Sequence, residues 1–435
     1  MTDTKAILDF AAADHTLPVS ARADTLRLLA DTLAGGAAGA NSPEAQALLP
    51  AVRSWGAGDD ARVIGGAETL PAASAAYFNG FAIHCLEWDA VHEPAVVHAL
   101  STVTAAVLAS ADRCGDVSEE DVVTALALGV DIASGIGLSA RGPMRFFRPA
   151  TAGIIGAALA AARLEGLSRE QMADILGLAY SQAAGTMQAH VEASIALPLQ
   201  IANAAQGAIH AVDLARAGMN GPHDALDGPF GYSALIEEID LSRYTRDLGS
   251  TWRISEISIK PFPSGRASHG VLGALSGLIE QRRFDPQSVA SITVHAPPLI
   301  HRLVGRPYKP GMTPAYARLC LPFLVPLMLR DAMIDPRHFT ASGMADEKIA
   351  ALAGNVAVVL DDNSDGNALT PQRLIIAMHN GEVLEEQIDV NLGSPDAPMN
   401  AAVANSKYGT CAALAAPNCD PRIFDNPLSY VMEKI

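Results

Sequence analysis

The 435-residue sequence contains little cysteine, and its five cysteines form no recognisable pattern. They are scattered, odd in number and never spaced as Cys-x-x-Cys, so they predict neither a disulfide framework nor a zinc or iron–sulfur site. A reducing cytoplasm suits this usage. The first residues are polar and lack the basic start and apolar run of a signal peptide, and we therefore expect a cytoplasmic protein.

Positive charge is also scarce. Thirty Lys and Arg stand against 47 Asp and Glu, a formal net charge of -17 that repels phosphate backbones and anionic lipid head groups. No uninterrupted apolar run reaches the roughly 20 residues that span a bilayer. We expect neither nucleic acid nor membrane as a partner. If the substrate is an anion, its site must be a local cationic pocket that opposes the overall charge.

Several common enzyme signatures are missing. Gly135-Ile136-Gly137 lies inside a helical pattern and lacks the preceding strand that a dinucleotide-binding motif needs. Neither Gly-x-Ser-x-Gly nor His-Glu-x-x-His occurs. These absences argue against a nucleotide cofactor, an α/β-hydrolase serine and a zinc-protease site.

Apolar residues, in contrast, make up 49% of the chain and charged residues 18%, which supplies ample core. The length favours two domains. Apolar residues return every three or four positions as far as Ala217, the helical period, and predict a large all-helical domain. The predicted helices include 26–33, 103–109, 122–138, 153–164, 172–184 and 201–217.

The pattern changes after Trp252. Residues 254–259 alternate as in a strand and end in the rigid turn Lys260-Pro261-Phe262-Pro263. Further strands are predicted at 291–295, 355–360, 373–378 and 382–390, the last two joined by the hairpin signal Asn380-Gly381. The helical composition of 401–414 predicts a return to the first domain. We therefore expect a mainly α protein, with a helical domain of residues 1–257 and 395–435 and a smaller α/β lid domain of residues 258–394.

Polar groups gather most densely between Asn79 and His98, where His84, Glu87 and Asp89 alternate with apolar residues and His92 and His98 follow. On a helix His84 and Glu87 would share one face, and Asp89 and His92 another, offering a base with a group that orients it. The alternative is a helix end with solvated acids and one core histidine. Metal binding is a lesser alternative, because no zinc-type spacing appears.

Cationic residues form three further groups. Lys260, Arg266 and His269 lie beside the rigid turn, where Arg266 could grip a carboxylate; the alternative is a cationic hinge without a ligand. Arg148 precedes a Gly- and Ala-rich helix, whose dipole favours an anion. For Tyr316-Ala317-Arg318, ahead of an apolar helix, a structural and a functional role are equally open.

Taken in order, these residues resemble the MmgE/PrpD family. The likeness runs from about Phe10 to Ala415 and rests on several segments: Asn79-Gly80 with His84 and Leu86-Glu87-Trp88-Asp89, Arg148-Pro149 with Thr151 and Gly153, Ser181 to Gly185, Asn203-Ala204-Ala205, and Lys260 to Pro263 with Ser268-His269-Gly270. The resemblance implies a helical domain with an α/β lid, a homodimer, and no metal or organic cofactor. It also implies 2-methylcitrate dehydratase, cis-aconitate decarboxylase or iminodisuccinate epimerase activity.

The match is uneven. Where the family commonly has Leu-Asp-Phe-Asp-Asp-Thr, this chain has residues 86–91 as Leu-Glu-Trp-Asp-Ala-Val. The usual Phe-His-Pro becomes Phe147-Arg148-Pro149, the Lys expected before Pro198 is Leu197, and the Tyr of decarboxylases is Phe323. Lys260, His269 and His98 persist. The anion-binding positions are thus kept, while several acid/base groups are lost.

A hydrogen next to a carboxylate is weakly acidic, so its removal needs a base and nearby positive charge. We predict His98 as the base, oriented by Glu87 or Asp89, with His84 and His269 as further donors. Lys260, Arg266 and Arg148 supply charge, and His92 is a further substrate-binding candidate. The expected activity is a 2-methylcitrate dehydratase-like hydro-lyase acting on a small polycarboxylate. The alternatives are an epimerase or isomerase, a decarboxylase, and a non-catalytic carboxylate-binding homologue.

Overall fold

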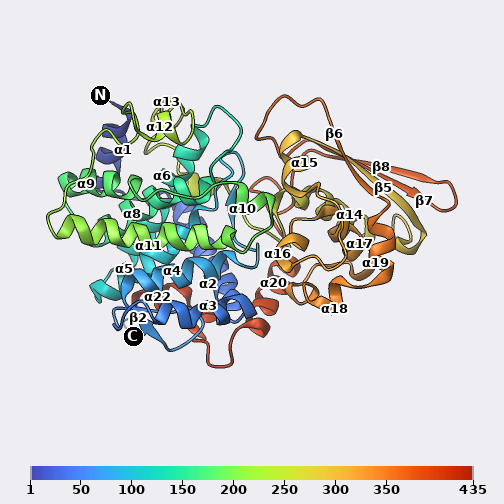
Figure 1. The fold of residues 1–435 in the computed structure, drawn as a ribbon, viewed down its shortest axis with the longest axis horizontal. Coiled ribbons are helices and arrows are strands. Elements are labelled where there is room, and N and C mark those ends of the chain that lie inside the picture. Colours follow the sequence, from blue (N-terminus) through green and yellow to red (C-terminus); the bar gives the residue numbers. More distant parts are fainter. Residues whose placement is uncertain (1, 434–435) are drawn as a thin grey trace.

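The computed structural model describes residues 2–433 and divides into a helical part and a mixed α/β part (Figure 1). The predicted helices of the first half are all present, but the one predicted at 172–184 ends at Tyr180, and several others extend beyond the predicted bounds. The helices before residue 250 are α1 Asp3–Ala12, α2 Val19–Ala40, α3 Pro43–Arg53, α4 Ala72–His84, α5 Ala99–Cys114, α6 Glu119–Leu138, α7 Arg148–Thr151, α8 Gly153–Leu164, α9 Arg169–Tyr180, α10 Gln188–Val191, α11 Ala196–Arg216, α12 Tyr232–Leu235 and α13 Ser242–Thr245.

Small residues let the central helices touch. A β-carbon on Gly156 in α8 would lie 2.3 Å from the backbone oxygen of Gly129 in α6, so nothing larger than glycine fits at this crossing. Among the helices of residues 2–433, α6 alone is long and apolar enough to cross a membrane, but 89% of its apolar window is buried inside the protein. It is therefore the core helix of this part.

The second part contains a four-stranded sheet in the order β6-β5-β7-β8, in which only the β5–β6 pair is parallel. Its predicted strands are confirmed, as is the hairpin at Asn380-Gly381. The strands are β5 Val289–Ala296, β6 Val356–Leu360, β7 Gln372–Met378 and β8 Val383–Ile388. The helices are α14 His269–Glu280, α15 Pro298–Val304, α16 Pro314–Ala317, α17 Leu321–Asp331, α18 Ala341–Met344 and α19 Glu347–Ala353. Alternate β5 residues are buried where α14 and α17 cover one face of the sheet.

The strand predicted at 254–259 is largely wrong. Arg253–Glu256 forms the 3-10 helix η1, and only Ile257–Ser258 is a strand, β4. Strand β4 pairs antiparallel with β3, Val91–His92, while β1, Ala61–Arg62, pairs with β2, Thr69–Leu70. The helical part is thus not all-helical, because these short pairs tie its loops together.

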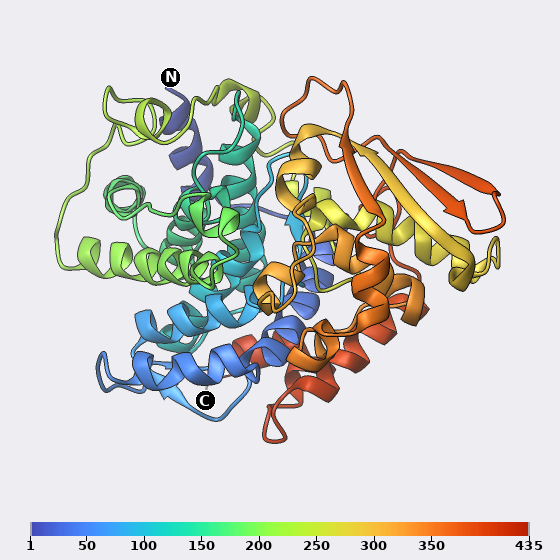
Figure 2. The ribbon, with the colours of Figure 1, turned by 45° about the vertical axis from the view of Figure 1, so that its right-hand side comes forward.

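The chain then returns to the helical part, as its composition predicts (Figure 2). The returning helices are α20 Ala401–Leu414, α21 Arg422–Asp425 and α22 Pro427–Met432, and each packs against α2. Two hydrophobic clusters result. One joins residues 7–259 with 411–431 and Leu319, and the other is built from residues 262–388. The exact residues at which the two domains meet, 257/258 and 394/395, remain predictions.

Candidate active site

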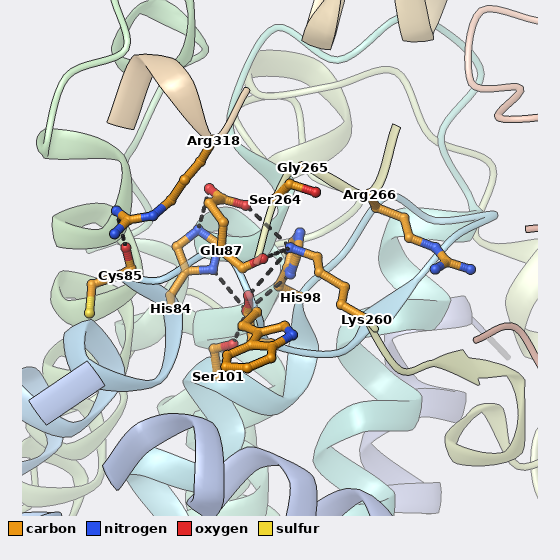
Figure 3. A network of polar contacts seen from close by, with 12 residues as sticks. His84, Cys85, Glu87, His98, Ser101, Lys260, Ser264, Gly265, Arg266 and Arg318 are labelled. Atoms are coloured by element: carbon orange, nitrogen blue, oxygen red, sulfur yellow. Dashed lines mark hydrogen bonds and ion pairs between the residues drawn. The ribbon is translucent and has the colours of Figure 1, made fainter. Parts of the chain in front are cut away.

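The predicted polar cluster lies on a turn, and the helix expected through it ends early. Helix α4 stops at His84, and Glu87 adopts a left-handed backbone conformation with φ of 54°. The chain then reverses through β3, and His98 stands at the start of α5. The two histidines therefore approach each other from two helix ends, their ring centroids 5.0 Å apart, and Glu87 lies beside them (Figure 3). Asp89 lies on the same turn as Glu87. The expected sharing of helix faces is wrong.

Strand pairing brings Lys260 to the same place. Val91 pairs with Ser258 in antiparallel register. Asp89, two residues before Val91, therefore comes opposite Lys260, two residues after Ser258. The Lys260 Nζ atom lies 3.6 Å from Asp89 Oδ1 and 3.2 Å from Glu87 Oε2, and it donates to the Glu87 backbone oxygen at 3.1 Å. Its ammonium is fully buried, so these two carboxylates compensate its charge.

Asp89 links the two histidines. His84 Nδ1 donates to Asp89 Oδ2 at 2.8 Å, and His98 Nδ1 lies 3.0 Å from the same oxygen. Ser101, one turn into α5, donates its hydroxyl to that oxygen as well. His98 Nδ1 meets this oxygen at ion-pair distance but without hydrogen-bond geometry. A carboxylate this close favours the His98 tautomer that carries its proton on Nδ1, which leaves Nε2 free to accept one.

Both carboxylates are held ionised. Burial alone would raise the pKa of Glu87, but Lys260 and the two histidines outweigh it and lower that pKa to about 2. Burial would also raise the pKa of Asp89, but His84, His98 and Lys260 outweigh it and keep that pKa well below the usual range. The turn therefore carries two permanent negative charges.

The two histidines respond in opposite ways to this charge. Burial would lower the pKa of His84, but Asp89 and Glu87 outweigh it and raise that pKa above 6.5. For His98 burial prevails, Asp89 offsets it only in part, and the pKa falls below 6.5. His84 therefore holds its proton more strongly than His98 does, an arrangement that separates an acid from a base.

A cavity of about 60 Å³ lies beside these side chains, where the two parts of the chain meet. Its polar lining is His84, Glu87, His98, His190 and Arg266, whereas Asp89 and Lys260 lie behind it. One water-sized sphere occupies about 10–15 Å³, so the space admits several such spheres and suits a small molecule. The remaining walls are mainly apolar: Val91, Val96, Met144, Phe147, Met187, Leu197, Leu303, Val304, Leu319 and Leu369.

Comparisons with known proteins agree with this architecture. The profile of the MmgE/PrpD N-terminal domain matches residues 8–242, and that of the MmgE/PrpD C-terminal domain matches residues 262–424. The chain belongs to the MmgE/PrpD family. The cis-aconitate decarboxylase of Homo sapiens is 24% identical over 418 residues, which cover 92% of this chain and 86% of the relative. A cis-aconitate decarboxylase of Aspergillus terreus is 24% identical over 411 residues, or 88% and 84%.

In this MmgE/PrpD chain His98, Glu87, Asp89, Lys260 and His84 come together, but Arg148 does not join them. The guanidinium of Arg148 is fully buried and pairs with Glu237, with Nη2 2.6 Å from Oε1. It also donates to the backbone oxygens of Ala95 and Gly142 and to Asn367. These partners occupy the donors that we expected to hold a substrate carboxylate.

Arg266 touches the cavity but directs its guanidinium elsewhere (Figure 3). Nη2 lies 2.6 Å from Glu93 Oε1, and Nη1 donates to the Leu392 backbone oxygen at 2.7 Å. His269 is fully buried behind it, 3.2 Å from the Ser264 backbone oxygen, and burial lowers its pKa well below the usual value. Arg266 and His269 thus connect parts of the MmgE/PrpD fold in this structure.

His92 also has both ring nitrogens in use. Its Nε2 atom lies 2.7 Å from Glu256 Oε2, and its Nδ1 atom accepts from the Ala95 backbone amide at 3.1 Å. It lies on β3 and belongs to the frame of the turn, away from the cavity lining.

Two polar residues of the MmgE/PrpD site escape sequence reasoning. His190, on the four-residue helix α10, lines the cavity, and burial lowers its pKa to about 4. Ser101 lies in an Ala-rich helix, where a lone hydroxyl carries no signal. Both are brought to the site by packing between elements distant in sequence.

His84, Asp89 and His98 offer potential metal ligands within 4.8 Å of one another. The Lys260 ammonium, 3.6 Å from Asp89, opposes a cation at this point. The two histidine Nδ1 atoms already face the carboxylate, so the geometry fits a proton-transfer network better than a metal centre.

Proposed function

We propose that this chain is a lyase that removes a proton next to a carboxylate of a small polycarboxylic acid, as a hydro-lyase of the 2-methylcitrate dehydratase type. One observation carries the proposal: His84 and His98 share Asp89 and border one cavity, yet their pKa values are shifted in opposite directions. A dehydration needs such a pair, because a base must accept the carbon-bound proton and an acid must protonate the leaving hydroxyl.

In the proposed step, Nε2 of His98 takes the proton from the carbon next to the carboxylate. The electron pair of that C–H bond forms the carbon–carbon double bond. The C–O bond of the neighbouring hydroxyl breaks, and the oxygen leaves with its electron pair and receives a proton from His84 as water. Asp89 stabilises the imidazolium that forms at His98 and fixes its orientation.

The charges around the cavity fit this step. Glu87 and Asp89 contribute two negative charges, and Lys260 and protonated His84 two positive ones, so the resting cluster is balanced. The apolar walls exclude water, which strengthens each of these interactions. Lys260 and Asp89 act through their neighbours as positioning residues. No cofactor is needed for the step.

Decarboxylation of a cis-aconitate-like acid is the second candidate, and the names of the relatives favour it. Here a C–C bond would break with loss of carbon dioxide, and the electron pair left on carbon would take the proton of His84. The apolar walls favour this loss of charge.

The test is proton NMR of citrate-like and aspartate-like polycarboxylates incubated with the protein in heavy water. We expect deuterium next to a carboxylate and an unsaturated product. Release of carbon dioxide would indicate the decarboxylase, and inversion without loss of a group would indicate an epimerase. A folded protein that exchanges no hydrogen in any of these acids would contradict the proposal.

The variant His98→Asn provides the control for the base. The asparagine amide can donate to Asp89 in place of Nδ1, so the melting temperature should change little, while the loss of Nε2 should lower exchange by about 10²- to 10⁴-fold. Equal activity of an equally stable His98→Asn protein would show that another group is the base.

A further inference from the structure

Buried positive charge is almost always paired in this protein. Seven Arg or Lys side chains are buried within residues 2–433, and six of them lie within 4.0 Å of a carboxylate. Arg318 is the exception. It lies on the loop between α16 and α17, its side chain is 95% buried, and no carboxylate of the described residues pairs with it.

The Arg318 contacts use only part of its hydrogen-bonding capacity. Nη1 donates to the Cys85 backbone oxygen at 3.2 Å, and the guanidinium lies over the Phe339 ring, 5.1 Å from its centroid. A guanidinium has five N–H donors, and the buried Nε finds no hydrogen-bond partner among residues 2–433. An unpaired charge in such a place costs several kcal/mol unless an anion joins it.

A second cavity, of about 20 Å³, lies against Arg318. It shares His84, Glu87, Leu197 and Leu319 with the larger cavity, so the two spaces adjoin. A volume of 20 Å³ exceeds the about 10–15 Å³ of one water-sized sphere, which suits the oxygens of one carboxylate. The neighbouring Glu87 carboxylate does not oppose an anion strongly, because Lys260 pairs with it.

The N-terminus of α11 forms another part of the wall of this small cavity. Ser194 and Ile195, directly before the helix, and Leu197 in its first turn line the space. Helix α11 is 21 residues long, and its first amide, that of Ala196, donates to the side-chain oxygen of Ser194 at 3.2 Å. The positive end of its dipole and the Arg318 side chain thus line one enclosure from two parts of the chain.

We propose that the cavity beside Arg318 is a carboxylate subsite, which holds the end of a di- or tricarboxylic acid remote from the reacting carbon. The substrate would lie across both cavities, with one carboxylate against Arg318 and the reacting carbon between His84 and His98. This inference rests on the proposed function for its substrate class. It also resolves the open role of Tyr316-Ala317-Arg318 in favour of binding.

The test compares two acids of four carbons, succinate and butyrate, which differ by one carboxylate. Their dissociation constants are measured by calorimetry for the wild type, Arg318→Gln, Arg318→Lys and the matched surface variant Arg330→Gln. The wild type should bind succinate about 10- to 100-fold more tightly than butyrate, the usual value of a charge-assisted hydrogen-bonded pair. Arg318→Gln should bring this ratio close to one, Arg318→Lys should keep part of it, and Arg330→Gln should keep all of it.

An unchanged ratio in a folded Arg318→Gln protein would overturn the subsite, as would a wild type that binds neither acid. If Arg318→Gln weakens the binding of both acids equally, Arg318 has a structural role instead. If Arg318→Gln does not fold, the ratio is measured for Arg318→Ala with added guanidinium, and an unchanged ratio there leads to the same conclusion. The readout is binding without turnover. A preserved succinate preference with no deuterium exchange would therefore contradict the proposed reaction and leave the subsite standing.

Discussion

At the scale of single residues, the two histidines show how position alone separates an acid from a base. His84 has Asp89 against one nitrogen and Glu87 near the other, at 3.6 Å, and both charges favour its imidazolium. His98 has Asp89 as its one close carboxylate, and burial, together with the positive charges of Lys260 and His84, lowers its pKa. One carboxylate therefore serves two histidines, and the second carboxylate makes them different.

This difference predicts a bell-shaped dependence of kcat/KM on pH. His98 must be neutral, so activity is lost as the pH falls through its pKa, which lies below 6.5. His84 must be protonated, so activity is lost as the pH rises through its pKa, which lies above 6.5. Initial rates measured from pH 4 to 10 should show an acid limb below pH 6.5 and an alkaline limb above it.

Glu87→Gln is the control, because it removes one of the two charges that raise the pKa of His84. The alkaline limb should move to lower pH, while the acid limb should move little. A profile with a single limb, or with both limbs on the same side of pH 6.5, would contradict the assignment of acid and base.

At the scale of elements, regular helices and strands follow from local patterns, whereas the site does not. The period of three to four residues in α6 or α11 and the Asn-Gly signal between β7 and β8 are local, so the sequence predicts them. The same helical pattern was wrong between His84 and His92. There the backbone turns at Glu87 because Lys260, 173 residues away, binds its backbone oxygen and carboxylate.

Distance along the chain also explains why the sequence did not show which cationic side chains are free to bind an anion. Arg148 is prominent in the sequence, but its partner Glu237 lies 89 residues away and no local pattern links the two. The sequence leaves the role of Arg318 open, and this residue becomes distinctive only when burial leaves it without a carboxylate partner. A sequence identifies residue types that can bind anions; packing determines which of them are free to do so.

The C-terminal helix α20 offers a prediction at this scale. Its Lys407 is buried, pairs with Asp31 of α2 at 2.6 Å and donates to the Trp88 backbone oxygen at 3.1 Å, within the turn that carries Glu87 and Asp89. Lys407→Met should destabilise the protein by about 3–5 kcal/mol, because Asp31 is left buried without a partner. Urea unfolding followed by circular dichroism measures this loss, and kcat should fall by about 10- to 100-fold as the turn loosens.

The double variant Asp31→Leu/Lys407→Met separates positioning from stability. It removes both charges, so most of the lost stability should return. The bond to Trp88 stays absent, and kcat should therefore remain low. If activity returns together with stability, Lys407 has no role in positioning the turn.

At the scale of the whole molecule, the site joins two parts that bring opposite contributions. The helical part supplies His84, Glu87, Asp89 and His98, and the segment leading into the α/β part supplies Lys260 and, further on, Arg318. Around this junction the protein carries a net charge of -17. An anionic substrate must therefore approach against the overall field to reach a small interior that compensates its charge.

This opposition predicts an unusual salt effect. Screening weakens the long-range repulsion at higher ionic strength, while the buried contacts in the cavity are screened much less. Raising the ionic strength from about 10 mM to about 150 mM, over which the Debye length falls from about 30 Å to about 8 Å, should increase kcat/KM for the polycarboxylate. The chemical step lies inside the protein, so kcat should stay constant.

Stopped-flow or initial-rate measurements in an inert salt test this salt effect. A monomethyl ester of the substrate is the control, since one fewer negative charge should reduce the effect. A fall in kcat/KM with salt would mean that local positive potential at the entrance, and not the net charge, governs the approach of the substrate.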